Sequence, residues 1–274
     1  MKRHIFLFIS VSVLFFSCVE NMPVIPEIPN DFSDRKVLVE EFTGVQCVNC
    51  PTGSLELENL LSIYGENLIV VSIHAGDFAA PYPQNVHDFR TPEAENLINY
   101  LKNPPSYPSA VVNRKDFDGG FYIIQYPLSK WAGFIDQELE SDAKIGVTIT
   151  KNYDPITREL SVQVTGLAAE NLSGDLRLTV MITENNIEDA QETPGAGIVL
   201  DYNHKHVFRT TMTNYDGDSF ATQLNVGDNY DESYSMILPE EWDAAECEVI
   251  AFVSLVDGDE YKEVLQAAEV HVED

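Results

Sequence analysis

Basic residues are scarce in this chain of 274 residues, which has 16 Lys and Arg against 45 Asp and Glu and a formal charge of −29. Because so acidic a protein repels a polyanion, nucleic acid is excluded as a partner. Long apolar runs are also lacking after the N-terminus, so we expect no later membrane span and a soluble body. Cysteine is rare as well, with four residues in all. At 44% hydrophobic residues, the chain is nevertheless able to bury more than one core.

The single long apolar run lies at the N-terminus, where a basic start precedes Ile5–Phe16. A run too short to span a bilayer after basic residues is typical of a signal peptide, which we assign to residues 1–18. The small residue Ser17 before Cys18 indicates a lipoprotein cleavage site, so Cys18 is the predicted lipidation site, with ordinary cleavage and loss of Cys18 as the alternative. Residues 19–34 contain three prolines and little periodicity, which predicts a tether. We therefore expect an exported protein with a lipid anchor to a membrane.

The candidate chemistry centres on Cys47 and Cys50, which follow the apolar run Val37–Phe42. After them, apolar residues recur at helical spacing and end at a glycine, namely Leu57, Leu60, Leu61, Tyr64 and Gly65. A strand, a Cys-x-x-Cys pair and a helix in this order are typical of a redox-active dithiol. Unpaired N–H groups in the first helical turn stabilise a thiolate, and Pro51 fits that turn because its missing N–H has no partner there.

The predicted export of the protein also bears on the three cysteines that follow Cys18. In an oxidising compartment Cys47 and Cys50 are close enough in sequence to pair with each other and to persist as a disulfide. Cys247 is then left over, within an apolar, strand-like run. We interpret it as a buried thiol of the core.

Residues 35–142 alternate strands with helices. The pattern predicts a strand at Asn67–Ile73, a helix at Glu93–Lys102, a strand at Ser109–Asn113 led by Pro108, an edge strand at Phe121–Ile124 and a helix at Leu128–Leu139. Strand, helix and strand in succession build a parallel sheet. A proline directly before a strand is a typical place for a cis peptide bond.

This order of elements resembles a thioredoxin domain. In that family a buried acidic residue six positions before the first cysteine precedes a Phe, and the same positions here hold Glu41 and Phe42. The resemblance implies that Cys47 is the attacking thiol and Cys50 the resolving thiol. It also implies that Glu41 accepts a proton through water and that a cis-proline, here Pro108, keeps a substrate disulfide near the attacking sulfur.

Two further residues, Tyr107 and Gln46, are the predicted substrate contacts next to this dithiol. Gln46 also departs from the thioredoxin pattern, in which Trp stands at that position. Val48-Asn49 replaces Gly-Pro, and Pro51 replaces a common Lys. Because potentials in this fold differ by more than 100 mV, these departures leave the direction of electron flow open. No resident cofactor is expected.

From residue 143 onward, apolar and polar residues alternate in runs separated by turns, as at 160–164, 176–182 and 249–253. About seven such strands without a strong helix favour an immunoglobulin-like β-sandwich over residues 143–274. The expected fold class is thus an α/β thioredoxin-like domain at residues 35–142 followed by an all-β immunoglobulin-like sandwich. Together with the signal peptide, this arrangement resembles the twenty-eight-kilodalton outer-membrane-protein family of bacterial lipoproteins. The resemblance implies an outer-membrane location, facing the periplasm or the cell surface.

Three histidines are weak candidates for metal binding. His204 and His206 would share one face of a strand, which with a third ligand suits zinc or copper, although a hydrogen-bonded surface pair is the simpler interpretation. His74 ends a strand beside the dithiol helix, where it is placed to shift the pKa of Cys47. A minor alternative is copper chelation by Cys47, Cys50 and His74.

Two functions of different classes follow. The first is thiol-disulfide exchange with protein dithiols or disulfides, in which Cys47 attacks and Cys50 resolves. The second is a non-catalytic binding lipoprotein, at the cell surface or in the periplasm, in which a Cys47–Cys50 disulfide is purely structural.

Overall fold

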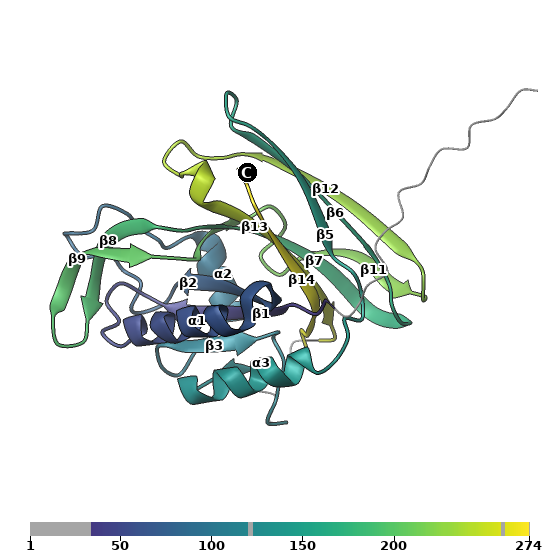
Figure 1. Cartoon of the computed structure of the whole chain (residues 1–274), viewed down its shortest axis with the longest axis horizontal. Helices are drawn as coiled ribbons and strands as arrows, with labels where there is room; N and C mark the ends of the chain where they lie inside the picture. Colours follow the sequence, from purple (N-terminus) through teal and green to yellow (C-terminus); the bar gives the residue numbers. More distant parts are fainter. Residues whose placement is uncertain (1–33, 120–122, 259–260, 274) are drawn as a thin grey trace, which may run out of the picture.

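The computed structural model describes residues 34–119, 123–258 and 261–273 (Figure 1). The predicted signal peptide, the lipidation site Cys18 and most of the predicted tether lie outside these residues. No helix within the described ranges has the length and apolar character needed to cross a bilayer.

The first half contains the expected succession of strands and helices. Its elements are β1 (Val37–Thr43), α1 (Cys50–Tyr64), β2 (Leu68–His74), α2 (Pro92–Tyr100), β3 (Ser109–Val112), β4 (Ile124–Gln125) and α3 (Trp131–Leu139). The peptide bond between Tyr107 and Pro108 is cis, as expected, and so is the bond between Tyr126 and Pro127. Part of the edge strand predicted at Phe121–Ile124 lies outside the described residues.

Local sequence explains where α1 and α2 begin and end. Pro51 occupies the first turn of α1, and the helix stops at Gly65, whose φ of 55° is favourable for glycine. Thr91 precedes α2, and its side chain accepts a hydrogen bond of 3.0 Å from the Ala94 backbone N–H. Each helix then buries one apolar face against the sheet.

The second half is almost entirely β-structure. Its strands are β5 (Thr148–Asp154), β6 (Glu159–Leu167), β7 (Leu172–Glu184), β8 (Ile187–Thr193), β9 (Gly197–His204), β10 (Val207–Thr211), β11 (Asp218–Leu224), β12 (Asn229–Ile237), β13 (Cys247–Val256) and β14 (Val264–His271). Strands β12, β6 and β5 form a three-stranded sheet, and β8 and β9 form a hairpin of their own.

The expected fold class, an α/β thioredoxin-like domain followed by a separate immunoglobulin-like sandwich, is wrong. Strands of both halves form one mixed sheet in the order β14-β13-β7-β10-β2-β1-β3-β4, with β11 also paired to β7. The halves join where β10 runs parallel to β2, with Val207 opposite Ser72, and the Ser72 N–H donates to the His206 carbonyl at 2.7 Å. Figure 1 shows this continuous sheet running behind α1. Alternation along each strand says nothing about which strand is its neighbour, so this junction was not predicted.

The long strand β13 is buried on both faces. Val249, Ala251 and Val253 of β13 pack into the core beneath the three-stranded sheet. Ile250 and Phe252 face the opposite way, into the core that contains α2. The expectation of apolar residues alternating with polar ones in β13 is therefore wrong, because this strand has packing partners on each side. Cys247 at its start is a fully buried core thiol, as expected, and burial raises its pKa to about 12.

A buried ion pair lies between β1 and β13. The Arg114 guanidinium donates two hydrogen bonds to the Glu40 carboxylate, at 2.7 and 2.8 Å, and both side chains are almost completely buried. The guanidinium also lies over the Phe252 ring, 4.7 Å from its centroid. Arg114 therefore connects the first half of the sheet to the second.

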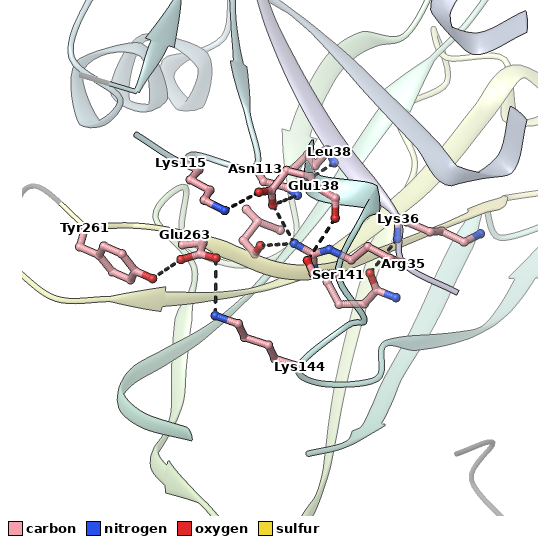
Figure 2. Close-up of polar contacts among 12 residues, drawn as sticks. Arg35, Lys36, Leu38, Asn113, Lys115, Glu138, Ser141, Lys144, Tyr261 and Glu263 are labelled. Atoms are coloured by element: carbon pink, nitrogen blue, oxygen red, sulfur yellow. Dashed lines mark hydrogen bonds and ion pairs between the residues drawn. The ribbon is translucent and has the colours of Figure 1, made fainter. Parts of the chain in front are cut away.

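A second polar cluster joins the start of β1, α3 and β14 (Figure 2). Arg35 donates to Glu138 at 3.0 Å and to the Val264 carbonyl at 3.2 Å. Asn113 donates to the same Glu138 carboxylate at 2.8 Å and accepts the Leu38 N–H at 2.9 Å. The two halves thus share buried polar contacts as well as a sheet.

We predict that Arg114→Met destabilises the protein by about 3–5 kcal/mol, because the Glu40 carboxylate is left buried without a partner. The double variant Arg114→Met, Glu40→Leu should lose less, since no charge then remains buried. Urea unfolding at neutral pH measures both. The matched control is Arg90→Met, which breaks an exposed pair with Asp88 and should cost at most about 1 kcal/mol. A loss in the double variant as large as in Arg114→Met would contradict the assignment.

Candidate functional site

Cys47 and Cys50 form a disulfide at the start of α1. Cys50 is the first residue of the helix, and its N–H donates to the Cys47 carbonyl at 3.1 Å. Cys47 is 4% exposed and Cys50 1% exposed, so neither sulfur is freely accessible. The backbone N–H groups of the first turn lie next to Cys50, where they favour a thiolate.

The turn that carries the disulfide is covered by the β8–β9 hairpin. The Gln191 side-chain amide donates to the Cys47 carbonyl at 3.2 Å and to the Gly44 carbonyl at 3.3 Å. The Glu192 N–H donates to the Val45 carbonyl at 2.8 Å. Gln191 was not among the predicted site residues, because it lies 144 positions from Cys47 and no sequence pattern connects the two.

The predicted substrate contacts Gln46 and Tyr107 are engaged within the protein. The Gln46 N–H donates to the Phe78 carbonyl at 2.9 Å, and the Tyr107 hydroxyl donates to the Ala75 carbonyl at 2.8 Å. The Tyr107 ring also packs against Phe78, with 5.2 Å between the ring centroids. These contacts hold the loop after β2 beside the disulfide turn.

Gly53 allows α1 to approach both Glu41 and Pro108. A Cβ atom at this position would lie 2.7 Å from Glu41 Oε1 and 2.8 Å from Pro108 Cβ. Glu41 and Pro108, two of the predicted catalytic residues, therefore meet beside Gly53, and the Ser54 hydroxyl lies 3.4 Å from both Glu41 Oε2 and the carbonyl of Cys50, a third. A larger residue than glycine would separate them.

Glu41 is a fully buried carboxyl group without a cationic partner. Burial raises its pKa from 4.5 to about 8, although hydrogen bonds from Ser72 and Ser54 lower it in part. The Ser72 hydroxyl lies 3.2 Å and the Ser54 hydroxyl 3.4 Å from Oε2, whereas Oε1 has no hydrogen-bond partner. Glu41 is therefore mostly protonated at neutral pH and able to donate a proton.

A cavity of about 400 Å³ lies beside Glu41, between α1 and the end of β9. Its lining comprises Glu41, Thr43, Pro51, Ser54, Leu55, Leu57, Glu58, Val70, Ser72, His74, Gln191, Tyr202, Asn203, His204, Lys205 and His206. Neither cysteine is among these residues. The cavity thus lies beside the disulfide turn without including the sulfurs.

The structure brings together His74 and His204, which the sequence did not connect. Their ring centroids lie 5.6 Å apart, and Phe89 packs against both rings at 4.8 Å. Burial lowers the pKa of His74 to about 3 and that of His204 to about 4, so both rings are neutral. The expected face shared by His204 and His206 is absent, because β9 ends at His204 and His206 has a φ of 53° between the strands.

The described residues contain no pre-formed metal site. No group of three or more His, Cys, Asp or Glu side chains is arranged to hold a metal ion in residues 34–119, 123–258 and 261–273. Cys47 and Cys50 are bonded to each other, so the thiolate ligands of the copper alternative are already engaged.

Comparison with known proteins identifies the family of this chain. Residues 96–274 match the model of the family described as outer membrane protein Omp28. The chain belongs to this family. Omp28 membership confirms the exported, outer-membrane location expected from the sequence. The matched region contains Pro108, Gln191 and the cavity wall formed by residues 202–206, whereas Glu41, Cys47 and Cys50 precede it.

Two solved structures have a fold similar to that of this Omp28-family protein. HBP35 of Porphyromonas gingivalis has a TM-score of 0.69 at 19% identity, covering 86% of this chain and 75% of that one. A protein from Agrobacterium tumefaciens has a TM-score of 0.53 at 13% identity, covering 88% and 96%. A domain of the outer membrane lipoprotein Omp28 from P. gingivalis has a TM-score of 0.32 at 21% identity, covering 47% and 87%. No curated protein matches the sequence.

We predict that Glu41→Gln becomes more stable than the wild type as the pH rises. The wild-type carboxyl group, whose pKa is raised in the folded state, holds a proton that the unfolded chain releases above pH 4.5. The contribution of the Glu41 carboxyl group to stability is complete below pH 4.5 and is lost as the pH rises through 8. A glutamine at this position does not titrate, so its contribution stays constant. The difference in unfolding free energy should widen by up to about 1.4 kcal/mol per pH unit. Urea unfolding from pH 4 to pH 9 measures it, and a constant difference would contradict the assignment.

A second prediction concerns the cover over the disulfide. Gln191→Ala removes the amide that donates to the Cys47 and Gly44 carbonyls, so the β8–β9 hairpin should open more often. Reduction of the disulfide by dithiothreitol should then become about fivefold faster, which corresponds to the loss of ~1 kcal/mol of hydrogen-bond free energy. Gln163→Ala is the control, because Gln163 is an exposed residue bonded to Asp231 on β12. Equal reduction rates in the wild type and Gln191→Ala would show that the hairpin does not restrict access.

Proposed function

We propose that this Omp28-family lipoprotein performs thiol-disulfide exchange at Cys47 and Cys50, with protein dithiols as its partners. The observation that supports the proposal best is the position of the disulfide, at the first turn of α1 beside the buried Glu41 carboxyl group and Pro108. A disulfide that merely closes a turn does not require a buried acid without a cationic partner next to it.

The exchange begins from the disulfide form. A substrate thiolate attacks the Cys47 sulfur, the more exposed of the two, and the Cys47–Cys50 bond breaks. Cys50 leaves as a thiolate at the helix N-terminus, where backbone N–H groups stabilise it. The second substrate thiol, once deprotonated, attacks the mixed disulfide. This attack is at the substrate sulfur, so the bond to Cys47 breaks and Cys47 leaves as a thiolate, which takes up the proton given up by the second substrate thiol. The substrate is thereby oxidised to a disulfide by two electrons, and the protein is left as a dithiol.

Glu41 is suited to the proton transfer in this sequence. Its pKa, raised to about 8 by burial, keeps a proton available at neutral pH for the Cys50 thiolate. Transfer through a water molecule is required, because Cys50 is not among the hydrogen-bond partners of Glu41. Pro108 lies opposite Gly53, and its proposed role is to align the substrate chain with Cys47.

A structural disulfide is the second candidate function, and the near-complete burial of both sulfurs favours it. In this case the disulfide stabilises the turn before α1, and the protein acts by binding a partner elsewhere. The carbonyl of Cys47 held by Gln191 is compatible with such a staple. The two candidates differ in whether Cys47 exchanges with an external thiol.

We expect a Cys50→Ser variant to accumulate a mixed disulfide with a peptide that carries one disulfide, because the Cys47 thiolate attacks and no resolving thiol remains. Cys47→Ser is the matched control, and its adduct should be at least about tenfold less abundant because Cys50 is the more buried thiol. Mass spectrometry after proteolysis localises the adduct and distinguishes it from adducts at other cysteines. Equal or absent adducts in the two variants would favour the structural disulfide.

A further inference from the structure

The cavity beside Glu41 has a mixed apolar and polar lining, of which the proposed exchange uses only Glu41. One wall is a partly exposed stripe of α1, at Pro51, Ser54, Leu55 and Glu58, and the opposite wall is residues 202–206. Strands β1 and β2 supply the floor through Glu41, Thr43, Val70 and Ser72. The volume of about 400 Å³ falls within the range of small-molecule sites.

The charges in the lining disfavour an anion. Lys205 supplies the only ammonium or guanidinium group of the described lining, and its Nζ lies 2.6 Å from Glu58 Oε2. The same carboxylate accepts from His206 at 3.3 Å, and these two partners hold the pKa of Glu58 at about 2 despite its partial burial. An anionic ligand would therefore compete with Glu58 for its partners, in a protein with a formal charge of −29.

Several polar atoms in the lining are buried without a hydrogen-bond partner. His206 directs Nε2 at the Glu58 carboxylate, 3.3 Å away, and its Nδ1 has no hydrogen-bond partner. His204 is 4% exposed, and its ring interacts with the backbone of Asp189 and Ala190 in β8. Its Nε2 atom is left without a hydrogen-bond partner. Glu41 adds a fully buried Oε1 without a partner. His204 Nε2 is an acceptor in this arrangement, and Glu41 Oε1 becomes one when the carboxyl group loses its proton. Both atoms therefore suit a ligand rich in N–H groups.

We propose that this cavity binds a primary alkylammonium group, with the ammonium near Glu41 and the histidines and its methylene stem against Leu55, Leu57 and Val70. Glu41 serves as the counter-ion, because a cation within its reach favours the carboxylate over the acid. Binding at neutral pH therefore releases about one proton from Glu41. The site shares Glu41 with the proposed exchange, but neither cysteine lines the cavity.

Such an ammonium group has two sources, a free amine or a lysine side chain of a polypeptide. Titration calorimetry of the full-length protein with n-butylamine and with N-acetyl-lysine amide separates them. Binding of the free amine alone identifies a small-molecule site, and binding of both identifies a site that also accepts a lysine side chain. Either result agrees with the proposal, and binding of neither overturns it.

The charge preference is tested with ligands of equal length. n-Butylamine should bind at least about tenfold more tightly than n-butanol or n-butyrate at pH 7, a difference of roughly 1.4 kcal/mol. Titrations in two buffers of different ionisation enthalpy should show the release of the Glu41 proton. Equal affinity for the three ligands, or tighter binding of butyrate, would overturn the proposal.

Two variants test the residues involved. Glu41→Gln should abolish both the preference for the amine and the proton release, whereas Glu66→Gln, an equal change of charge on an exposed residue outside the cavity, should leave both intact. Leu55→Lys places an ammonium group at the exposed wall and should weaken n-butylamine binding by about tenfold or more through competition, with Leu55→Met as its control. Leu55 is 61% exposed, so this variant is expected to fold even if Glu41→Gln does not.

The cysteines separate this site from the exchange reaction. The double variant Cys47→Ser, Cys50→Ser should bind n-butylamine with wild-type affinity, because the sulfurs do not line the cavity. Failure of the exchange reaction would therefore leave amine binding intact. Loss of the amine preference in a folded double variant would overturn the assignment to this cavity.

Discussion

The pairing of β10 with β2 is the constraint on which the candidate sites depend. The Ser72 N–H donates to the His206 carbonyl, and Val207 lies opposite Ser72, so the second half of the chain is held against the strand that follows α1. The β8–β9 hairpin precedes this junction directly and is therefore placed over the disulfide turn. Without the junction, neither the Gln191 contact nor the second wall of the cavity would exist.

Two adjacent residues of β1 show how one strand serves both faces of the sheet. Glu40 points to the side of α2 and β13, where Arg114 neutralises it, while Glu41 points to the side of α1 and has no cation. Side chains alternate along a strand, so neighbouring acids experience opposite environments. One is a structural ion pair and the other keeps a raised pKa of about 8. The same pair of residues thus contributes to stability on one face and to candidate chemistry on the other.

Much of the local structure could be predicted from particular residues. Leu57 and Leu60, Pro51 and Gly65 determine the buried face and both ends of α1, and the apolar run after it becomes β2. The burial of Cys247 also follows from its neighbours. In contrast, the alternation in β13 was misread, because Ile250 and Phe252 belong to a second core that only the assembled sheet creates. The prediction that His206 shares a strand face with His204 was wrong, because β9 ends at His204 and His206 has a positive φ.

The sequence by itself determined the outer-membrane location, the family and the Cys-x-x-Cys pair, because each depends on residues that are close together or on a pattern along the chain. Only the tertiary structure decided what surrounds that pair. Gln191, His204 and the cavity wall come from residues more than 140 positions after Cys47, and strand pairing across that distance has no local signal in the sequence. The acidity of Glu41 was likewise decided by burial, because a carboxyl group acquires a raised pKa from the atoms that exclude water around it.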